Sequence, residues 1–128
     1  MSYYLRKEIS GQSMPEVIDR TTEALKTEGF GILTTIDMKA TLKAKIGADI
    51  EPYTILGACN PNFANQALQK EENIGVFLPC NVLVKQKPDY FEIVAVDPIS
   101  SMTAVPNKDL LSFAEEVKSM LSRALDRV

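Results

Sequence analysis

The chain contains two cysteines, and both lie in short motifs of similar composition. Cys59 occurs in "LGACNPNFA" at 56–64 and Cys80 in "FLPCNV" at 77–82. Each cysteine is followed directly by asparagine, and a proline adjoins each pair, giving Cys59-Asn60-Pro61 and Pro79-Cys80-Asn81. A thiol can act as a nucleophile, bind a metal, form a disulfide, or serve as a small buried side chain. The surrounding residues favour some of these roles over others.

The chain has no histidine and no tryptophan. A Ser-His-Asp triad, a Cys-His pair and an imidazole metal ligand are therefore excluded. Two thiolates would need carboxylates to complete a four-coordinate metal site, and the candidate ligands are not closely spaced. Only a dimer, which doubles the thiols to four, keeps a metal site open. We predict no metal and no cofactor, so any catalysis would have to use Cys, Asp, Glu, Lys or Tyr.

Cys59 ends the apolar stretch 53–59, which is typical of a strand, and precedes an Asn-Pro pair. Asparagine is a preferred N-cap and proline a preferred first helical residue, so the pattern predicts a helix that begins just after Asn60. Asn60 therefore has a sufficient structural role without a ligand. The same position would place the Cys59 thiol near a helix N-terminus, which lowers the pKa of a thiol.

Cys80 follows Pro79 in the stretch 73–87, which we predict to be one long strand. Proline cannot donate to a β-ladder, so Pro79 indicates an edge strand or a bulge, where a side chain can be redirected. Period-two alternation also places Cys80 among apolar residues on one face of that strand. That face comprises Ile74, Val76, Leu78, Cys80, Val82 and Val84.

These patterns leave three roles open for the cysteines: packing, contact with a ligand or thiol chemistry, and a disulfide. If both strand ends meet at one edge of the sheet, the two thiols would approach each other in one cleft. Asp97, directly before Pro98, has two interpretations as well. It is either ordinary turn chemistry or a carboxylate at the mouth of the same site.

The remaining sequence predicts the elements that would hold these residues. Ser13 with Glu16 forms a capping box, Asp37 and Asn107 are further candidate caps, and Gly29 and Gly47 suit helix ends. The expected elements are strands at 3–9, 31–36, 53–59, 73–87 and 90–97, helices at 14–28, 38–46 and 61–71, a loop at 97–106 and a long amphipathic helix after it. The last two strands pair antiparallel through a short turn at 87–89. We predict a single α+β domain over 1–128, with a mainly antiparallel sheet of about five strands and helices packed on one face.

Composition restricts the function further. Of the 128 residues, 45% are hydrophobic and 24% are charged, as in an ordinary globular domain. The formal net charge of −3 argues against nucleic acid as the main partner, since phosphate binding needs a basic surface. No apolar run has the length of a membrane helix, and the first residues lack the apolar core of a signal peptide. We therefore expect a cytoplasmic protein that does not associate with membranes.

Four segments together resemble one known family: "GFGILTTIDMKATLKAKIG", "YTILGACNPNFANQAL", "IGVFLPCNVLV" and "VAVDP". Their order and spacing, from about residue 14 to the final helix, are similar to those of the domain of unknown function 302 family. The most specific pieces are Cys59-Asn60-Pro61 with Ala64, Leu78-Pro79-Cys80, and Asp97-Pro98. The resemblance implies a fold like half of the TATA-binding protein, a β-α-β(4)-α core with extra short helices, and a tendency to dimerise. It implies no established activity.

Two functional hypotheses of different classes follow, and a third concerns docking. The first is a homodimeric binding or accessory module with a small-molecule site beside the two Cys-Asn pairs. The residues expected at that site are Cys59, Asn60, Pro61, Pro79, Cys80, Asn81, Asp97 and Met102. The alternative is a thiol-dependent enzyme or redox sensor, in which Cys59 is the nucleophile and Cys80 the resolving partner. In the third, the helix faces dock onto a larger partner protein.

Overall fold

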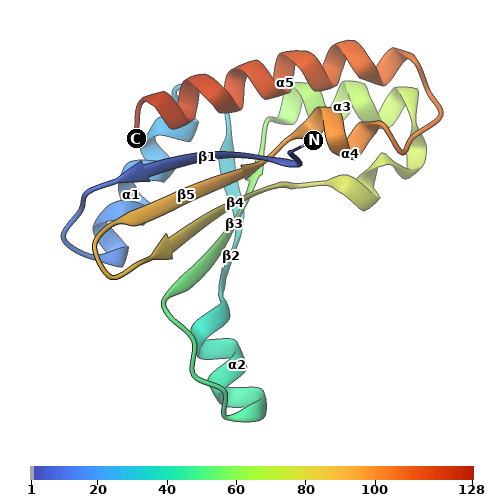
Figure 1. The fold of residues 1–128 in the computed structure, drawn as a ribbon. Helices are drawn as coiled ribbons and strands as arrows, with labels where there is room; N and C mark the ends of the chain where they lie inside the picture. Colours follow the sequence, from blue (N-terminus) through green and yellow to red (C-terminus); the bar gives the residue numbers. More distant parts are fainter. Residues whose placement is uncertain (1) are drawn as a thin grey trace.

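The computed structural model describes residues 2–128 and contains a five-stranded sheet with helices (Figure 1). The strands are β1 (Tyr4–Ile9), β2 (Gly31–Asp37), β3 (Tyr53–Cys59), β4 (Cys80–Gln86) and β5 (Phe91–Val96). The helices are α1 (Met14–Lys26), α2 (Met38–Ile46), α3 (Pro61–Lys70), the 3₁₀ helix η1 (Glu72–Phe77), α4 (Pro98–Met102) and α5 (Asp109–Asp126). All strand pairs are antiparallel, in the order β1-β5-β4-β3-β2. The predicted α+β class with a mainly antiparallel sheet is confirmed.

Helices α1 and α5 cover one face of the sheet. Helix α1 contacts β4, α5 contacts β1, and the two helices contact each other. Alternate strand residues point toward them and are fully buried, among them Leu56, Val82 and Ile93. Leu25 from α1 and Leu121 from α5 complete this core. The long α5 extends across the top of the sheet in Figure 1.

Among residues 2–128, no helix covers the middle of the other face of the sheet (Figure 1), although η1 and α4 reach its edge beside Asn81 and Val96. Ile36, Ile55, Leu83 and Val94 lie opposite one another on neighbouring strands and form an apolar row across this face. None of these four side chains is buried. We call this surface the open face.

The predicted caps Ser13, Asp37 and Asn60 form at helix starts, whereas α1 ends at Lys26, before the predicted residue 28, and the cap position of α5 is Lys108. The Ser13 hydroxyl accepts from the N–H of Glu16 (3.3 Å), Asp37 from that of Ala40 (2.9 Å), and Asn60 caps α3. Glu16 also reaches back as predicted, but its carboxylate accepts from the N–H of Gln12 (2.9 Å). Asn107 accepts from the N–H of Asp109 (3.1 Å) at the start of α5.

The long strand predicted at 73–87 is wrong in its first half. Residues 72–77 form η1, and β4 begins at Cys80, directly after Pro79. Because β4 is the central strand, it needs backbone donors that proline lacks, so Pro79 ends up outside the ladder. Val82 and Val84 share the helix-facing side with Cys80 as predicted, whereas Ile74, Val76 and Leu78 are not part of the strand.

The loop predicted at 97–106 is also wrong in part, because it contains helix α4. The carboxylate of Asp97 accepts from the N–H of Ile99 (2.9 Å), and Pro98 is the first helical residue. Asp97-Pro98 therefore repeats the cap chemistry of Asn60-Pro61.

Helix α2 lies apart from the core. Its apolar residues recur every four positions, yet none of its side chains is buried, and Ile46 is 74% exposed. Figure 1 shows α2 projecting beyond β2 and β3, on the side of the molecule away from α5. Within residues 2–128, no helix combines the length and hydropathy that crossing a lipid bilayer requires.

Candidate functional site

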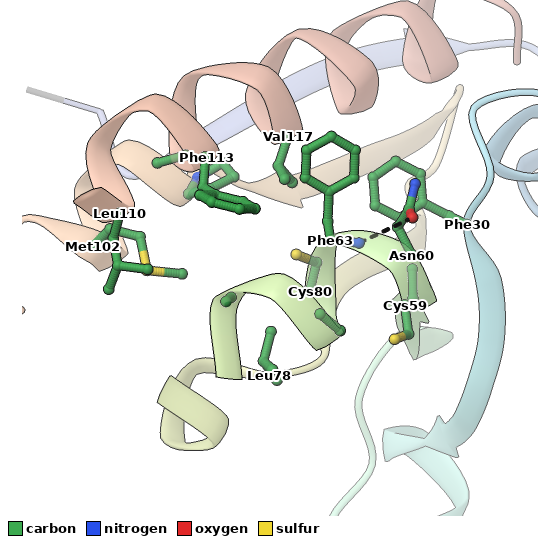
Figure 2. Close-up of a pocket in the computed structure, with 15 residues that line it drawn as sticks. Phe30, Cys59, Asn60, Phe63, Leu78, Cys80, Met102, Leu110, Phe113 and Val117 are labelled. Atoms are coloured by element: carbon green, nitrogen blue, oxygen red, sulfur yellow. Dashed lines mark hydrogen bonds between the residues drawn. The ribbon is translucent and has the colours of Figure 1, made fainter. Parts of the chain in front are cut away.

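A cavity of about 50 Å³ lies between α3, α4 and α5 at the ends of β3 and β4 (Figure 2). Its walls are almost entirely apolar, and it is half open to solvent. It is lined by Phe30, Ala58, Cys59, Asn60, Phe63, Ala64, Ala67, Leu78, Cys80, Pro98, Met102, Leu110, Phe113, Ala114 and Val117.

The cavity results from small residues between large ones. Phe63 of α3 and Phe113 of α5 meet edge to face, with their ring centroids 5.8 Å apart, and hold the two helices side by side. Alanine occupies the neighbouring positions at 58, 64, 67 and 114, and these short side chains do not fill the space between the aromatic rings. An unfilled space remains because backbones held apart by aromatic rings cannot close around alanine.

Asn60 is the polar residue at the rim, and both ends of its side chain have partners. Its Oδ1 accepts from the N–H of Phe63 at 3.5 Å, and its Nδ2 donates to the carbonyl of Glu28 at 3.2 Å. A Cβ at Gly29 (φ +84°) would lie 3.0 Å from that Nδ2. Asn60 therefore joins the start of α3 to the segment that follows α1.

The two cysteines are neighbours, but their side chains diverge. Cys80 is paired with Ala58, so its side chain leaves the same face of the sheet as that of Ala58, and Cys59 follows on the opposite face. In Figure 2 the sulfur of Cys80 faces the cavity, whereas that of Cys59 points away from it. Both cysteines are free. Both cysteines thus line one cavity, but their thiols diverge, because adjacent strand positions alternate in direction.

The environment of Cys80 is unfavourable for thiolate formation. Burial, with a smaller contribution from nearby Cys59, raises the pKa of the Cys80 thiol to about 11. Cys80 therefore stays protonated at neutral pH and acts as a small, weakly polar part of the wall.

The structure brings four of the eight predicted site residues to the cavity: Cys59, Asn60, Cys80 and Met102. The other four lie elsewhere. Pro61 is exposed in the first turn of α3. Asp97 is buried beneath α5, where its carboxylate pairs with the ammonium of Lys118 at 2.9 Å, and Pro98 lines the cavity in its place.

Pro79 and Asn81 line a second depression, of about 200 Å³, which borders the cavity at Leu78. It is formed with Val76, Phe77 and Val96. Asn81 follows Cys80 on the strand, so alternation turns its side chain toward the open face.

Sequence analysis missed the aromatic part of the site. Phe30 follows Gly29, Phe63 belongs to the apolar stripe of α3, and Phe113 lies on α5. The helical spacing of Phe63, Ala64 and Ala67 indicates a packed face, but only the placement of α5 opposite them reveals a gap. Among the described residues, no group of three or more Cys, Asp or Glu side chains is arranged to hold a metal ion.

Comparisons with known proteins identify a family and solved structures of similar fold. The family model described as "Domain of unknown function DUF302" matches residues 6–128. A crystal structure of an uncharacterized conserved DUF302 protein from Bacillus stearothermophilus is 30% identical and superimposes with a TM-score of 0.92, covering 99% of this chain and 98% of that one. No curated protein matches the chain. The chain therefore belongs to the DUF302 family.

Proposed function

We propose that this protein is a homodimeric, cytoplasmic binding module without catalysis of its own, whose cavity takes the apolar end of a small molecule. The observation that carries the proposal is the half-open apolar space between α3, α4 and α5. Ligand sites are typically concave and apolar, with few polar groups to orient the ligand. Here both polar atoms of the Asn60 side chain are already bonded within the chain, which leaves apolar contact as the main source of affinity.

The size of the cavity restricts the ligand. A space of about 50 Å³ is roughly a third of the ~150 Å³ cavity that accepts benzene in an engineered protein core. A group of about three carbons fits, such as the end of a short alkyl or branched acyl chain. Burying three methylene-sized groups contributes about 2.4 kcal/mol. A ligand of higher affinity would therefore also bind through atoms at the open mouth.

A homologous series of primary alcohols, from ethanol to hexanol, tests the proposal. We expect amide and methyl NMR shifts at cavity residues, with affinity rising up to about three or four carbons and then levelling off. Replacing Ala67→Leu fills the cavity from α3 and should abolish these shifts while preserving the fold. Ala40→Leu, on the exposed surface of α2, is the matched control and should bind as the wild type does.

Two results would refute this function. One is equal binding of the alcohols by the wild type and the Ala67→Leu protein, which would locate the probes outside the cavity. The other is turnover of a substrate by the isolated protein, which would contradict a non-catalytic module.

The thiol-dependent alternative has less support. Cys80 remains protonated at neutral pH, and the sulfur of Cys59 points away from the cavity. A nucleophile and its resolving partner would have to face each other, and these two side chains leave opposite faces of the sheet.

A further inference from the structure

We propose that two copies of this chain dimerise through the open face of the sheet, and that helix α2 of each copy packs against the sheet of the other. The inference rests on the homodimer of the proposed function and adds its surface. It is independent of the ligand cavity, which lies on the helix-covered side of the molecule.

The open face carries an apolar row across four strands, and beside it Leu83 and Val94 also line a hollow with Arg6, Tyr53, Lys85 and Glu92. The row Ile36, Ile55, Leu83 and Val94 crosses four adjacent strands. Ile36 is 43% exposed, and Leu83 lies at the middle of the row, on the central strand β4. Faces of this kind pack about 10 Å from a second sheet in β-sandwiches.

The charges on this face balance one another. Glu92 on β5 pairs with Arg6 on β1 and with Lys85 on β4, and Arg6 also pairs with Glu8. Two cations and two anions thus form one network, so the sheet part of the surface is neutral, whereas α2 carries Lys39, Lys43 and Lys45 and no acidic residue. Two such sheet faces therefore meet without net repulsion between them.

Helix α2 supplies the part of the surface that the sheet lacks. Met38, Leu42 and Ile46 follow one another every four residues, and none of them is buried in the single chain. Helix α2 is nevertheless well formed. Asp37 caps its start, Gly47 (φ +67°) ends it, and the Lys39 ammonium donates to the carbonyl of Ile50 at 2.5 Å. An ordered helix that buries nothing within its own chain is suited to burial against another copy.

The buried area shows whether the sheet alone is large enough for a specific dimer interface. Five strands of six or seven residues, about 4.8 Å apart and rising about 3.3 Å per residue, present roughly 500 Å². The 9 residues of α2 add roughly 130 Å² along one side. Two copies then bury roughly 1,200 Å², which reaches the lower limit of specific interfaces only when α2 is included.

A two-fold axis through the open face satisfies both contacts at once. In such an isologous interface every contact between two elements occurs twice. When α2 of one copy packs on the sheet of the other, the second α2 packs on the first sheet in the same way. The two α5 helices then lie on the outside of the dimer, and both cavities remain accessible.

Sedimentation velocity over a range of protein concentrations tests the interface. We expect a dimeric wild type, and Leu83→Lys should weaken dimerisation on the order of 100-fold, because it buries a charge at the centre of both faces. Ile46→Lys on α2 should weaken dimerisation without endangering the fold, because this side chain is 74% exposed. Urea unfolding of each variant verifies folding.

Leu111→Lys is the matched control. Leu111 is an equally large apolar residue, 52% exposed on α5, on the covered side of the sheet. This variant should remain a dimer. A dimer that persists in both Leu83→Lys and Ile46→Lys, or one that Leu111→Lys dissociates, would overturn the interface but not the homodimer. A monomeric wild type would overturn both, while the alcohol titration would still test the cavity.

Discussion

Cys80 is surrounded by carbon atoms on the strand that runs through the middle of the sheet. It has hydrocarbon on the cavity side and Cys59 as a close neighbour, and both disfavour the thiolate. The residue type alone suggests reactive chemistry, whereas its surroundings make this thiol a packing group.

Alkylation kinetics of single-cysteine variants test this interpretation of Cys80. In Cys59→Ser, the Cys80 reaction with iodoacetamide should have its midpoint above the ordinary pKa of 9.0 because of burial, but below that of the wild type, because the contribution of Cys59 is removed. In the wild type, the thiolate fraction of Cys80 at pH 8 should be about 100-fold below that of a thiol with the ordinary pKa of 9.0. The Cys80→Ser variant gives the alkylation rate of Cys59 by the same method. A Cys80 midpoint at or below pH 9 would favour a thiol-dependent enzyme or redox sensor over the binding module.

Asn60 contributes to stability from both ends of its side chain. Asn60→Ala removes the cap of α3 and the hydrogen bond to the Glu28 carbonyl, and it should lower the free energy of unfolding by about 1–2 kcal/mol. Asn60→Asp retains the cap but loses the donor, so it should fall between the wild type and Asn60→Ala. Urea unfolding measures all three.

The control for Asn60 is another asparagine of the same helix. Asn65 is exposed within α3 and accepts only a long hydrogen bond from Gln69 (3.5 Å). Asn65→Ala should leave stability within about 0.5 kcal/mol, because alanine has the higher helix propensity. A loss at Asn65 equal to the loss at Asn60 would contradict the capping role.

At the scale of elements, Glu28 joins the segment after α1 to the end of α5. Its carboxylate pairs with the guanidinium groups of Arg123 and Arg127. Desolvation raises the pKa of Glu28, but the hydrogen bonds from Arg127 and Arg123 outweigh it and hold the pKa below the ordinary 4.5. The ion pairs therefore stabilise the folded protein fully above pH 4.5, and this contribution is lost as the pH falls through the lower folded pKa.

Glu28→Gln should reveal this dependence. At pH 7 the variant should unfold at lower urea than the wild type, and the difference should shrink as the pH falls below 4.5. Glu23→Gln, which removes an exposed pair with Lys26, should change little at any pH. A Glu28→Gln deficit that stays constant down to pH 2 would exclude the titration of this carboxyl as its cause.

Local chemistry explains which elements could be predicted from sequence. The caps at Ser13, Asp37 and Asn60 depend on residues within three positions, so their sequence patterns suffice. The strand predicted through 73–79 fails because apolar composition does not distinguish a strand from η1. The fate of that segment depends on the central position of β4.

In the candidate site, too, residues set by local sequence could be predicted, and residues set by the packing of distant elements could not. Cys59, Asn60 and Cys80 could be predicted because they adjoin strand ends and a helix start, and Met102, at the end of α4, also reaches the cavity. Phe113 and Ala114 could not, because they reach the cavity only through the packing of α5 against α3. Asn81 was assigned to the site by its motif, and strand alternation turns it to the other face.

At the scale of the whole molecule, the exposure of α2 should depend on protein concentration. In a single chain its amides should exchange with solvent hydrogen quickly, because no residue of the helix is buried. In the proposed dimer they should become protected as concentration rises, while the amides of α1 stay unchanged. Hydrogen–deuterium exchange at one concentration below and one above the dimer dissociation constant measures the protection of α2. Protection that does not vary with concentration would contradict the contact between α2 and the second copy.

The position of β1 has a consequence for synthesis of the protein on the ribosome. This first strand pairs only with β5, and the ammonium of Lys7 donates to carbonyls in the last residues, at Leu125 (3.0 Å) and Val128 (3.3 Å). A nascent chain therefore carries an unpaired β1 until residues 91–96 emerge, and the Lys7 contacts wait for the final helix. Such distant pairings slow folding, so the domain should acquire its native structure only after helix α5 has been synthesised.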